Sequence, residues 1–287
     1  MSSNGPVSPR VREITVRRLG ELVDAAMPSH PDPASGRLRE PVVFRGAASA
    51  RWPLLSSLDR LGGLRPPHTK ADLEEHILRN FSRRCRPYLG HPNPSVWELL
   101  VIAQHHGIPT RLLDWTYSPL VAAHFATLEP NPGADRVVWK LHWGRLHERF
   151  GLQPLAFLVE DLDGVLRDKG FATPWDLFES NHVSPERTFA CLFDPPAYDD
   201  RLVVQAAAFT FCSDKGRTLD EVLRAYDLSD VLTRYIIPAD CVDYLRDQLD
   251  LCGIDERRIF PDLGGVAAEL RRYYSASRND RGQGGSP

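Results

Sequence analysis

The sequence predicts an α+β fold in one large domain, and two observations lead to that prediction. Amphipathic helical patterns and short apolar strand patterns alternate along most of the chain. Of the 287 residues, 42% are hydrophobic, which is enough to fill a sizeable core and excludes wholesale disorder. The chain contains no internal repeat and no heptad run, so neither a solenoid nor a coiled coil is predicted.

The two ends of the chain differ from the part between them. Residues 1–12 lack a periodic pattern and are expected to form a flexible leader. Residues 275–287 are polar and rich in glycine, a composition typical of a disordered tail. A single domain is therefore expected at residues 13–274.

Charge and cysteine usage exclude several classes of protein. The 35 Lys and Arg residues against 38 Asp and Glu residues give a net charge of −3, which excludes a generic polybasic nucleic-acid binder but leaves a local basic groove open. The start of the chain has no apolar signal segment, and no apolar run reaches the roughly 18 residues of a membrane span, so we expect a cytoplasmic protein without membrane contact. Five scattered cysteines with no CxxC pair predict reduced thiols and no metal site.

Capping residues mark the helix starts in the first half of the chain. A Ser or Thr before an amphipathic run can bind the free amide groups of the first helical turn. These signals predict four helices, which begin at Thr15, Thr69, Ser95 and Ser118. Pro119 strengthens the last of them, because proline is favoured at the first helical position. Residues 41–44 and 136–143 read as strands, and residues 61–67 read as a loop.

The second half of the chain alternates shorter elements. Helices are expected near residues 147–150, 161–168, 174–180, 218–226, 238–252 and 262–274. Strands are expected near residues 188–193, 201–211 and 231–237. Gly253 stands where a glycine commonly ends a helix, which supports the boundary of the helix before it.

Residues 104–116 carry more chemistry than a connector between two helices needs. The segment reads QHHGIPTRLLDWT and holds two histidines, an arginine, an aspartate and a tryptophan. Gly107 permits a positive φ after the helix, and Pro109 prevents the helix from continuing. A rigid loop with this composition is a candidate functional site.

Several motifs together resemble the FRG domain, a family named for its Phe-Arg-Gly signature. The matching segments are Val43-Phe44-Arg45-Gly46, Trp52-Pro53-Leu54, residues 104–116, Ser118-Pro119 and residues 122–126. The resemblance is strong from about residue 40 to residue 145. It continues more weakly through residues 201–211 and 259–263.

A second, fainter resemblance is to ADP-ribosyltransferases. Phe44-Arg45-Gly46 is similar to the early strand of that family that ends in an arginine, and Asp114-Trp115-Thr116, followed by Ala122 and Phe125, is similar to its second element. The third element of the family is a glutamate on a later strand, and the nearest counterpart here is Gln205. This resemblance implies an ADP-ribosyltransferase-like mixed sheet with flanking helices and NAD as substrate.

The replacement of a glutamate by Gln205 bears on the chemistry. Breaking the bond between nicotinamide and ribose builds positive charge on the sugar, which a nearby carboxylate stabilises. Gln205 can bind a ribose hydroxyl but brings no negative charge. Either Asp114 replaces the missing carboxylate, or catalysis is weak or absent.

The resemblance assigns roles to the remaining candidates. Arg45, beside Gly46, would hold the pyrophosphate, and Arg111 is a second candidate for binding phosphate. Thr116 and Gln205 would orient the ribose, Trp115 would stack on a ring, and His106 would face the substrate. Asp114 would fix Arg45 or act as the acid group, so we predict that these two side chains approach to roughly 4 Å.

Each of these residues also has a structural interpretation. Arg45 and Arg111 can form buried ion pairs, Trp115 can be a core aromatic, and Gln205 can be an ordinary hydrogen-bonding residue. His105 and His106 lie at a helix end, where they can bind loop backbone, and metal binding by them is not expected because no further ligands have suitable spacing.

Two functions follow from the sequence. The first, which the resemblance to ADP-ribosyltransferases implies, is an NAD-dependent ADP-ribosyltransferase-like enzyme or NAD glycohydrolase, an activity that suits bacterial toxins and phage-defence proteins. The second is a binding module in which the same cleft recognises a nucleotide, a nucleic acid or a protein without turnover. The nucleotide is the partner that both interpretations share.

Overall fold

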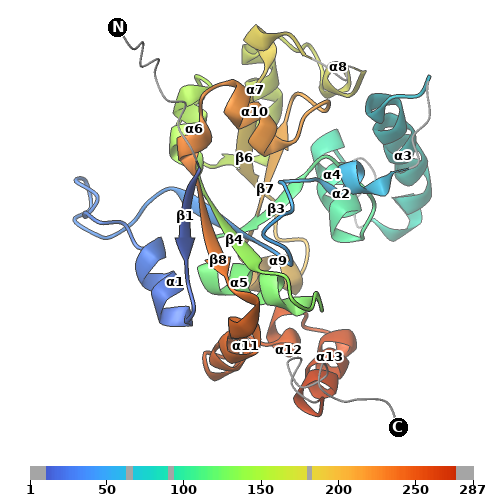
Figure 1. The fold of residues 1–287 in the computed structure, drawn as a ribbon. Coiled ribbons are helices and arrows are strands. Elements are labelled where there is room, and N and C mark those ends of the chain that lie inside the picture. Colours follow the sequence, from blue (N-terminus) through green and yellow to red (C-terminus); the bar gives the residue numbers. More distant parts are fainter. Residues whose placement is uncertain (1–10, 63–66, 90–93, 180–182, 276–287) are drawn as a thin grey trace, which may run out of the picture.

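We analysed a computed structural model of the protein, which describes residues 11–62, 67–89, 94–179 and 183–275. Eight strands form one mixed sheet in the order β1-β8-β4-β2-β3-β7-β6-β5. Their bounds are β1 Arg12–Thr15, β2 Val42–Ala47, β3 Leu113–Thr116, β4 Arg136–His142, β5 Phe157–Leu158, β6 Ala190–Asp194, β7 Ala207–Cys212 and β8 Leu232–Ile237. Helices flank this sheet, as Figure 1 shows, so the predicted α+β class is confirmed.

The α-helices of the described residues range from 4 to 16 residues in length. Their bounds are α1 Leu19–Ala26, α2 Ser57–Leu61, α3 Lys70–Cys85, α4 Val96–His105, α5 Pro119–Leu128, α6 Trp143–Arg149, α7 Leu162–Asp168, α8 Pro174–Glu179, α9 Asp200–Val204, α10 Leu219–Ala225, α11 Val242–Leu251, α12 Glu256–Ile259 and α13 Leu263–Tyr273. Most are amphipathic or buried on one side, so their stability comes from packing against the sheet and against one another.

The capping signals located three helices correctly. Thr69 and Ser95 each form a capping box with the acidic residue three positions later, and Ser118 accepts a hydrogen bond from the Val121 amide. These caps satisfy amide groups that the helix itself leaves free, which fixes where α3, α4 and α5 begin.

Two hydrophobic cores lie on the two faces of the sheet. Val43, on one face of β2, belongs to the larger core, which also includes residues of α4, α7, α8 and α10. Phe44, the next residue, faces the smaller core, which α1, α5 and α11 complete. This alternation of successive side chains is the ordinary geometry of a strand with both faces covered.

The first predicted helix is present as α1, but its predicted start at Thr15 was wrong. Thr15 is the last residue of β1, which pairs in parallel with β8, and α1 begins only at Leu19. Arg12 already belongs to this strand, so it is not part of a flexible leader, and residues 1–10 of the predicted leader lie outside the described residues. Ile14 and Thr15 are β-branched, and pairing with a free strand edge outweighs the capping signal.

Several other expectations can be compared with the structure. Of the predicted loop at 61–67, residues 63–66 lie outside the described residues, as does the predicted tail apart from Ser275. Residues 113–116, expected as part of a loop, form the central strand β3. Among the described residues, no helix is long and apolar enough to cross a membrane.

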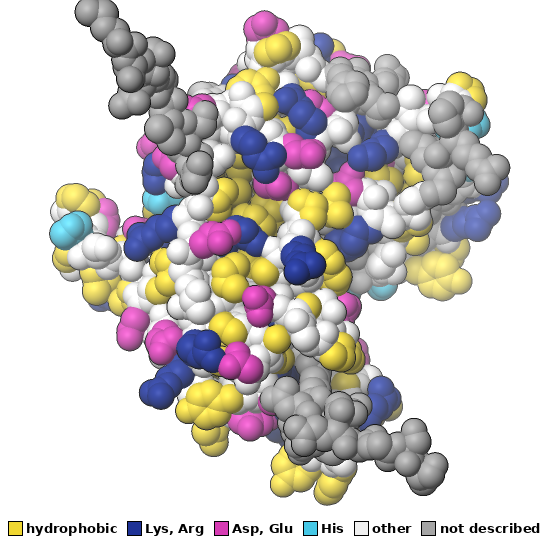
Figure 2. Space-filling model, in the orientation of Figure 1, with side chains coloured by type: hydrophobic (Ala, Val, Ile, Leu, Met, Phe, Trp, Pro, Cys, Tyr) yellow, Lys and Arg dark blue, Asp and Glu magenta, His cyan; other side chains and the backbone are white. Residues whose placement is uncertain are grey.

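The face of the molecule in Figure 2 carries charges of both signs. Lys and Arg side chains alternate with Asp and Glu over most of this surface, with apolar patches between them. This distribution agrees with the near balance of charge in the sequence and differs from the single-sign surface of a generic nucleic-acid binder.

Candidate functional site

The sheet opens at its centre, between β2 and β3. These strands are joined by one bridge pair, Phe44 with Thr116, whereas β2 pairs with β4 over six residues and β3 pairs with β7 over four. The sheet therefore consists of two halves that meet at one point. A cleft of about 470 Å³ is lined by residues of both halves, among them Arg45 and Asp114.

Arg45 connects the two halves. Its Nη1 donates a 2.7 Å hydrogen bond to the main-chain oxygen of Asp114 and lies 3.4 Å from the Asp114 carboxylate. This confirms the predicted approach of the two side chains. Both residues line the cleft, where the Arg45 side chain is 17% exposed and that of Asp114 is 52% exposed.

Two cations share this wall of the cleft. Burial lowers the pKa of Arg45, Asp114 counteracts that shift, and the charge of Arg60 adds to it. A guanidinium nevertheless stays protonated in a protein, so both arginines remain charged. Arg60 lines the same cleft, and its Nη1 donates to the carbonyl of Leu55. Two neighbouring guanidiniums form a suitable environment for an anion.

Gln104 holds the Asp114 carboxylate in place. Its Nε2 donates to both carboxylate oxygens, at 2.8 and 3.0 Å. Its Oε1 accepts hydrogen bonds from the Thr110 and Ser57 hydroxyl groups, which fixes the orientation of the amide. Gln104 and Thr110 thus act together, and they hold the Asp114 carboxylate beside Arg45.

Gly46 has a packing reason for its place in the Phe-Arg-Gly motif. A Cβ on this residue would lie 1.9 Å from the carbonyl oxygen of Ala122 and 2.4 Å from the amide nitrogen of Ala126. Both atoms belong to the backbone of α5, so no side-chain rotation could relieve the overlap. The glycine therefore allows α5 to lie directly against β2, next to Arg45.

A comparison with protein families identifies this part of the chain. Residues 40–135 match the model of the FRG domain. The protein contains an FRG domain. The matched residues include β2, α4, β3 and α5, and thus the whole Arg45, Asp114 and Gln104 network. Neither the search of curated proteins nor the search of solved structures gave a significant match.

Other predicted residues of the FRG domain have internal partners. Trp115 is 3% exposed, and its Nε1 donates to the Thr210 hydroxyl. Thr116 is equally buried, and its hydroxyl accepts from the amide of Ser118. Both line the cleft, so the structure brings them together with Arg45, Gly46 and Asp114. Because both side chains are buried, each exposes only a small part of its surface to a ligand.

His105 lies at the cleft, whereas His106 is exposed at the end of α4. The His105 Nε2 is 2.6 Å from the Asp199 carboxylate, and His105 is among the residues that line the cleft. Burial lowers the pKa of His105, and Asp199 opposes this shift. Consecutive residues of a helix point about 100° apart, so only one of the two histidines can face the cleft.

Arg111 is buried away from the main cleft. Its Nε and Nη2 donate to the same carboxylate oxygen of Glu74, at 2.9 and 2.6 Å, and its amide donates to the other oxygen. Its side chain is 3% exposed. Among the two interpretations that the sequence left open, this placement corresponds to the buried ion pair, so Arg111 is not included in the site that we propose below.

Gln205 lies at the C-terminal end of the short helix α9 and not within a strand. The predicted strand at 201–211 was wrong in its first half, because Asp199 caps the short helix α9 and Ala206 has a φ of +45°. Gln205 lines the cleft, and its Nε2 donates to the carbonyl of Ile259 at 3.1 Å. Two valines suggest a strand here, but the cap and the contact with α12 stabilise a turn.

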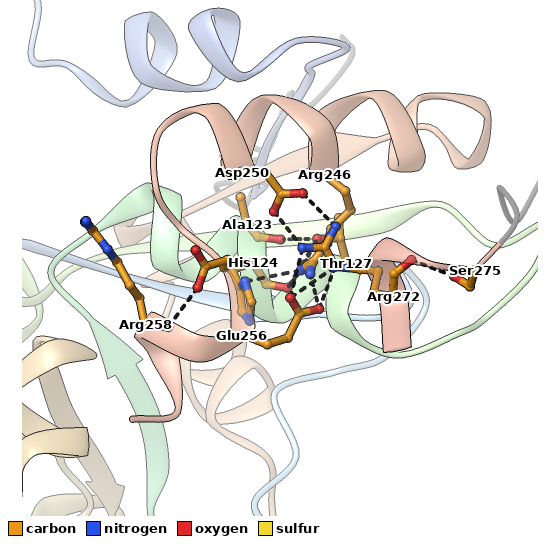
Figure 3. A network of polar contacts seen from close by, with 10 residues as sticks. Ala123, His124, Thr127, Arg246, Asp250, Glu256, Arg258, Arg272 and Ser275 are labelled. Atoms are coloured by element: carbon orange, nitrogen blue, oxygen red, sulfur yellow. Dashed lines mark hydrogen bonds and ion pairs between the residues drawn. The ribbon is translucent and has the colours of Figure 1, made fainter. Parts of the chain in front are cut away.

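The C-terminal helices support this side of the cleft through the network in Figure 3. Arg272 of α13 binds Asp250 of α11 with two hydrogen bonds of 2.7 Å and also binds Glu256 of α12. Arg246 reaches the same Glu256 carboxylate from α11. This network fixes α12, whose residue Ile259 carries the carbonyl that Gln205 binds.

Sequence reasoning missed several residues that line the cleft. Among them are Trp52, Arg60, Glu129 and Arg201. Trp52 is 47% exposed, so much of its ring is free to contact a ligand. Arg201 lies over the ring of Phe260, with its guanidinium carbon 4.9 Å from the centroid. Only the tertiary structure brings these residues together, because they come from four separate segments.

Among the described residues, no group of three His, Cys, Asp or Glu side chains gathers closely enough to hold a metal ion. The cleft instead combines arginines, two carboxylates and aromatic walls. Such a surface can bind phosphate groups and an aromatic ring in one ligand.

Proposed function

We propose that the cleft binds the ADP-ribosyl part of NAD or of a related nucleotide. The observation that carries this proposal is the pair of guanidiniums, Arg45 and Arg60, at the wall of a cleft of about 470 Å³. That volume lies within the range of about 300–1,000 Å³ that is usual for small-molecule sites. Arg45 and Arg60 bind the pyrophosphate oxygens, which prefer the forked donors of arginine.

The walls of the cleft suit the other parts of such a ligand. Trp52 and Phe125 offer aromatic surface for a base. The Oε1 of Gln205 accepts a hydrogen bond from a ribose hydroxyl, since its Nε2 already serves Ile259. His105, held by Asp199, replaces His106 as the histidine that faces the ligand.

We further propose that the bound NAD is cleaved in an ADP-ribosyltransferase-like reaction. The bond between ribose and nicotinamide breaks, nicotinamide leaves with the bonding electrons, and water or a macromolecular acceptor forms the new bond while losing a proton. The support is the juxtaposition of the Phe-Arg-Gly strand with the strand that ends at Thr116, in the order that the family resemblance implies.

Two carboxylates among the described residues lining the cleft can stabilise the positive charge of the reacting sugar. Asp114 is one, and Glu129, at the end of α5, is the other. Asp114 also holds Arg45, so its charge serves both binding and chemistry. An activity of this kind would suit a toxin or a phage-defence protein acting in the cytoplasm.

Calorimetric titration with ADP-ribose and with NAD tests the binding proposal. Arg45→Ala is expected to weaken binding at least tenfold, and Arg45→Lys to restore only part of it, because an ammonium lacks the forked geometry. Arg79→Ala is the matched control, since Arg79 is 72% exposed on α3 and does not line the cleft. Unchanged binding in folded Arg45→Ala would contradict the proposal.

Release of nicotinamide tests turnover separately. The protein is incubated with NAD, alone and with a cell lysate as the source of acceptors. Asp114→Asn keeps the shape and most hydrogen bonds of the carboxylate, so nucleotide binding should persist within a few-fold. The rate of nicotinamide release should fall by a factor on the order of a hundred.

A second candidate function is nucleotide binding without turnover. Gln205 favours it, because this residue brings no negative charge where the related enzymes have a glutamate, and its amide is already engaged by Ile259. Binding of ADP-ribose together with background release of nicotinamide, in buffer and in lysate, would assign the cleft to this second function.

A further inference from the structure

The C-terminal helix α13 packs on the rest of the molecule through one narrow face. Gly265 is buried against α12, where a Cβ would lie 1.9 Å from the carbonyl oxygen of Phe260. Arg272, seven residues later, reaches the carboxylates of Asp250 and Glu256. Residues seven apart lie on the same side of a helix, so Gly265 and Arg272 define the inner face of α13.

The opposite face of α13 carries exposed apolar side chains. It consists of Leu263, Ala267, Leu270 and Tyr274, which follow one another at spacings of four, three and four residues. Leu263 is 88% exposed, Leu270 48% and Tyr274 81%. Tyr273 extends this surface at one edge; it is 75% exposed, and its ring makes an edge-to-face contact with the Tyr274 ring. We call these five residues the α13 stripe.

The α13 stripe has the features of an interaction surface. Single exposed apolar side chains are ordinary, whereas a contiguous row of them on one helix face marks a contact with another molecule. Figure 1 shows α13 at the lower edge of the molecule, next to α12. Residues 276–287, which follow the helix in the sequence, include no leucine, isoleucine, valine or aromatic residue that would match the stripe.

The charges around the α13 stripe are balanced. Residues 255–274, which span α12 and α13, hold four acidic and four basic side chains. Arg272 is paired with two carboxylates, and the Nε of Arg257 lies 3.8 Å from the Glu269 carboxylate. A helix that binds an anionic lipid surface carries an excess of Lys and Arg on its polar face, which α13 lacks. The balance favours a protein partner whose contact surface is apolar and carries no strong net charge.

The order of side-chain sizes along the stripe is self-complementary in an antiparallel pair. The spacing of four, three and four residues reads the same in both directions, so a two-fold axis at its centre places the stripe of one copy on the stripe of another. Leu263 of one copy then faces Tyr274 of the other, and the small Ala267 faces Leu270. A parallel pair would set Ala267 against Ala267 and leave a gap between the helices. A second copy of this chain in the antiparallel orientation therefore fits the stripe best.

We propose that the α13 stripe is the contact surface of an antiparallel homodimer. A fully buried tyrosine contributes about 200 Å² and a leucine about 100 Å², so at the observed exposures the stripe offers roughly 500 Å² per copy. Two copies bury roughly 1,000 Å², which is at the lower end of specific interfaces. The dimer is therefore weak, with a Kd on the order of 10–100 μM.

The dimer contact is separate from the proposed nucleotide site. None of the described residues that line the cleft belongs to α13, so the cleft stays open in the dimer. The proposal therefore does not rest on the function proposed above. Failure of ADP-ribose binding would leave the dimer unaffected, and a monomeric protein would leave nucleotide binding unaffected.

Sedimentation equilibrium of the full chain, at concentrations from about 1 to about 300 μM, tests the proposal. The average mass should rise from that of the monomer toward that of the dimer. Leu263→Lys and Tyr274→Glu each place a charge in the contact, and each should raise the Kd at least tenfold. Both side chains are more than 80% exposed, so the thermal unfolding midpoint of the monomer should not change. Tyr88→Glu is the matched control, because Tyr88 is 87% exposed and lies outside the stripe.

A double variant tests the antiparallel orientation. Leu263→Lys combined with Tyr274→Glu in one chain puts opposite charges across the two-fold axis, so the dimer should recover to within a few-fold of the original Kd. Leu263→Lys combined with Tyr274→Lys should stay monomeric. A protein that is monomeric at every concentration, single variants that dimerise as well as the original chain, or a double variant that does not recover would overturn the proposal. Binding of a monomeric protein to phosphatidylglycerol vesicles through the same residues would overturn it too and would assign the stripe to a lipid surface.

Discussion

Two arginine–carboxylate networks of this protein differ in how completely they are paired. In the C-terminal network, Arg272 makes five hydrogen bonds of 2.7–3.0 Å to Asp250 and Glu256, and Arg246 shares the second carboxylate (Figure 3). At the cleft, Arg45 reaches the Asp114 carboxylate with one contact of 3.4 Å. The first network is mostly buried, and the second faces an open cavity.

The difference teaches which network supports the fold and which is available to a ligand. In the buried network each arginine has a carboxylate partner at short distance, so its role is to hold α11, α12 and α13 together. A loosely paired arginine at a cleft can exchange its weak contact for a phosphate group at little loss. The number of carboxylate contacts that an arginine makes therefore indicates whether it supports the fold or is available to a ligand.

The strongest test of this comparison is to break the buried network. Glu256→Ala leaves the buried Arg246, 4% exposed, without its carboxylate and also removes a partner of Arg272. An uncompensated buried charge of this kind destabilises a protein by about 3–5 kcal/mol. Chemical denaturation should show this loss in the free energy of unfolding.

The control for that measurement is an exposed pair. Arg79→Ala removes a surface partner of Glu75 and should change the unfolding free energy by about 1 kcal/mol or less. A similarly small loss for Glu256→Ala would show that the C-terminal network is not structural.

The second test asks what holds the Phe-Arg-Gly motif in place. Gly46→Ala puts a methyl group against two backbone atoms of α5, so the helix must move away from β2. Overpacking usually destabilises by about 1–3 kcal/mol, and a clash with backbone should reach the upper end of that range. Gly20→Ala, where nothing lies within 4 Å of the new methyl, is the matched control in thermal unfolding.

The third test uses pH to probe the buried network. Burial, followed by the charge of Arg246, lowers the pKa of His124 from 6.5 to about 4, and Arg246 donates to its Nδ1, so the ring is neutral in the folded state. Between those pH values the unfolded chain binds more protons than the folded one, so stability falls as the pH drops from about 6.5 to about 4.

The size of this effect can be isolated with one variant. His124→Asn keeps an acceptor near the position of Nδ1 and removes the titrating group. The dependence of unfolding free energy on pH should become shallower by up to about 1.4 kcal/mol per pH unit in that interval. Identical slopes in the two proteins would show that His124 is not held neutral by its surroundings.

Part of the fold and part of the candidate site could be predicted from the sequence. Helices α3, α4 and α5 were predicted because their caps are local, within three residues of the helix start. The approach of Arg45 and Asp114 was predicted from motifs that a family resemblance connects. Both predictions depended on short-range patterns or on a known family.

The rest of the site depends on contacts that no local pattern encodes. Glu74, the partner of Arg111, is 37 residues away on another helix. The choice of His105 over His106 follows from the rotation of α4 against the sheet. The single bridge pair between β2 and β3 joins residues 72 positions apart in the chain, Phe44 and Thr116, and residues 113–116 alone do not indicate it.

The smallest expected effect concerns the stability that the cleft pair itself contributes. A double-mutant cycle with Arg45→Ala and Asp114→Ala measures the interaction energy between the two side chains by chemical denaturation. Asp114 is half exposed and the contact is long, so water screens the pair, and we expect a coupling of about 1 kcal/mol or less. A coupling near 3 kcal/mol would put this pair on the same footing as Arg246 and Glu256. In that case Arg45 would be a structural residue, and its exchange of Asp114 for a phosphate group would no longer be favourable.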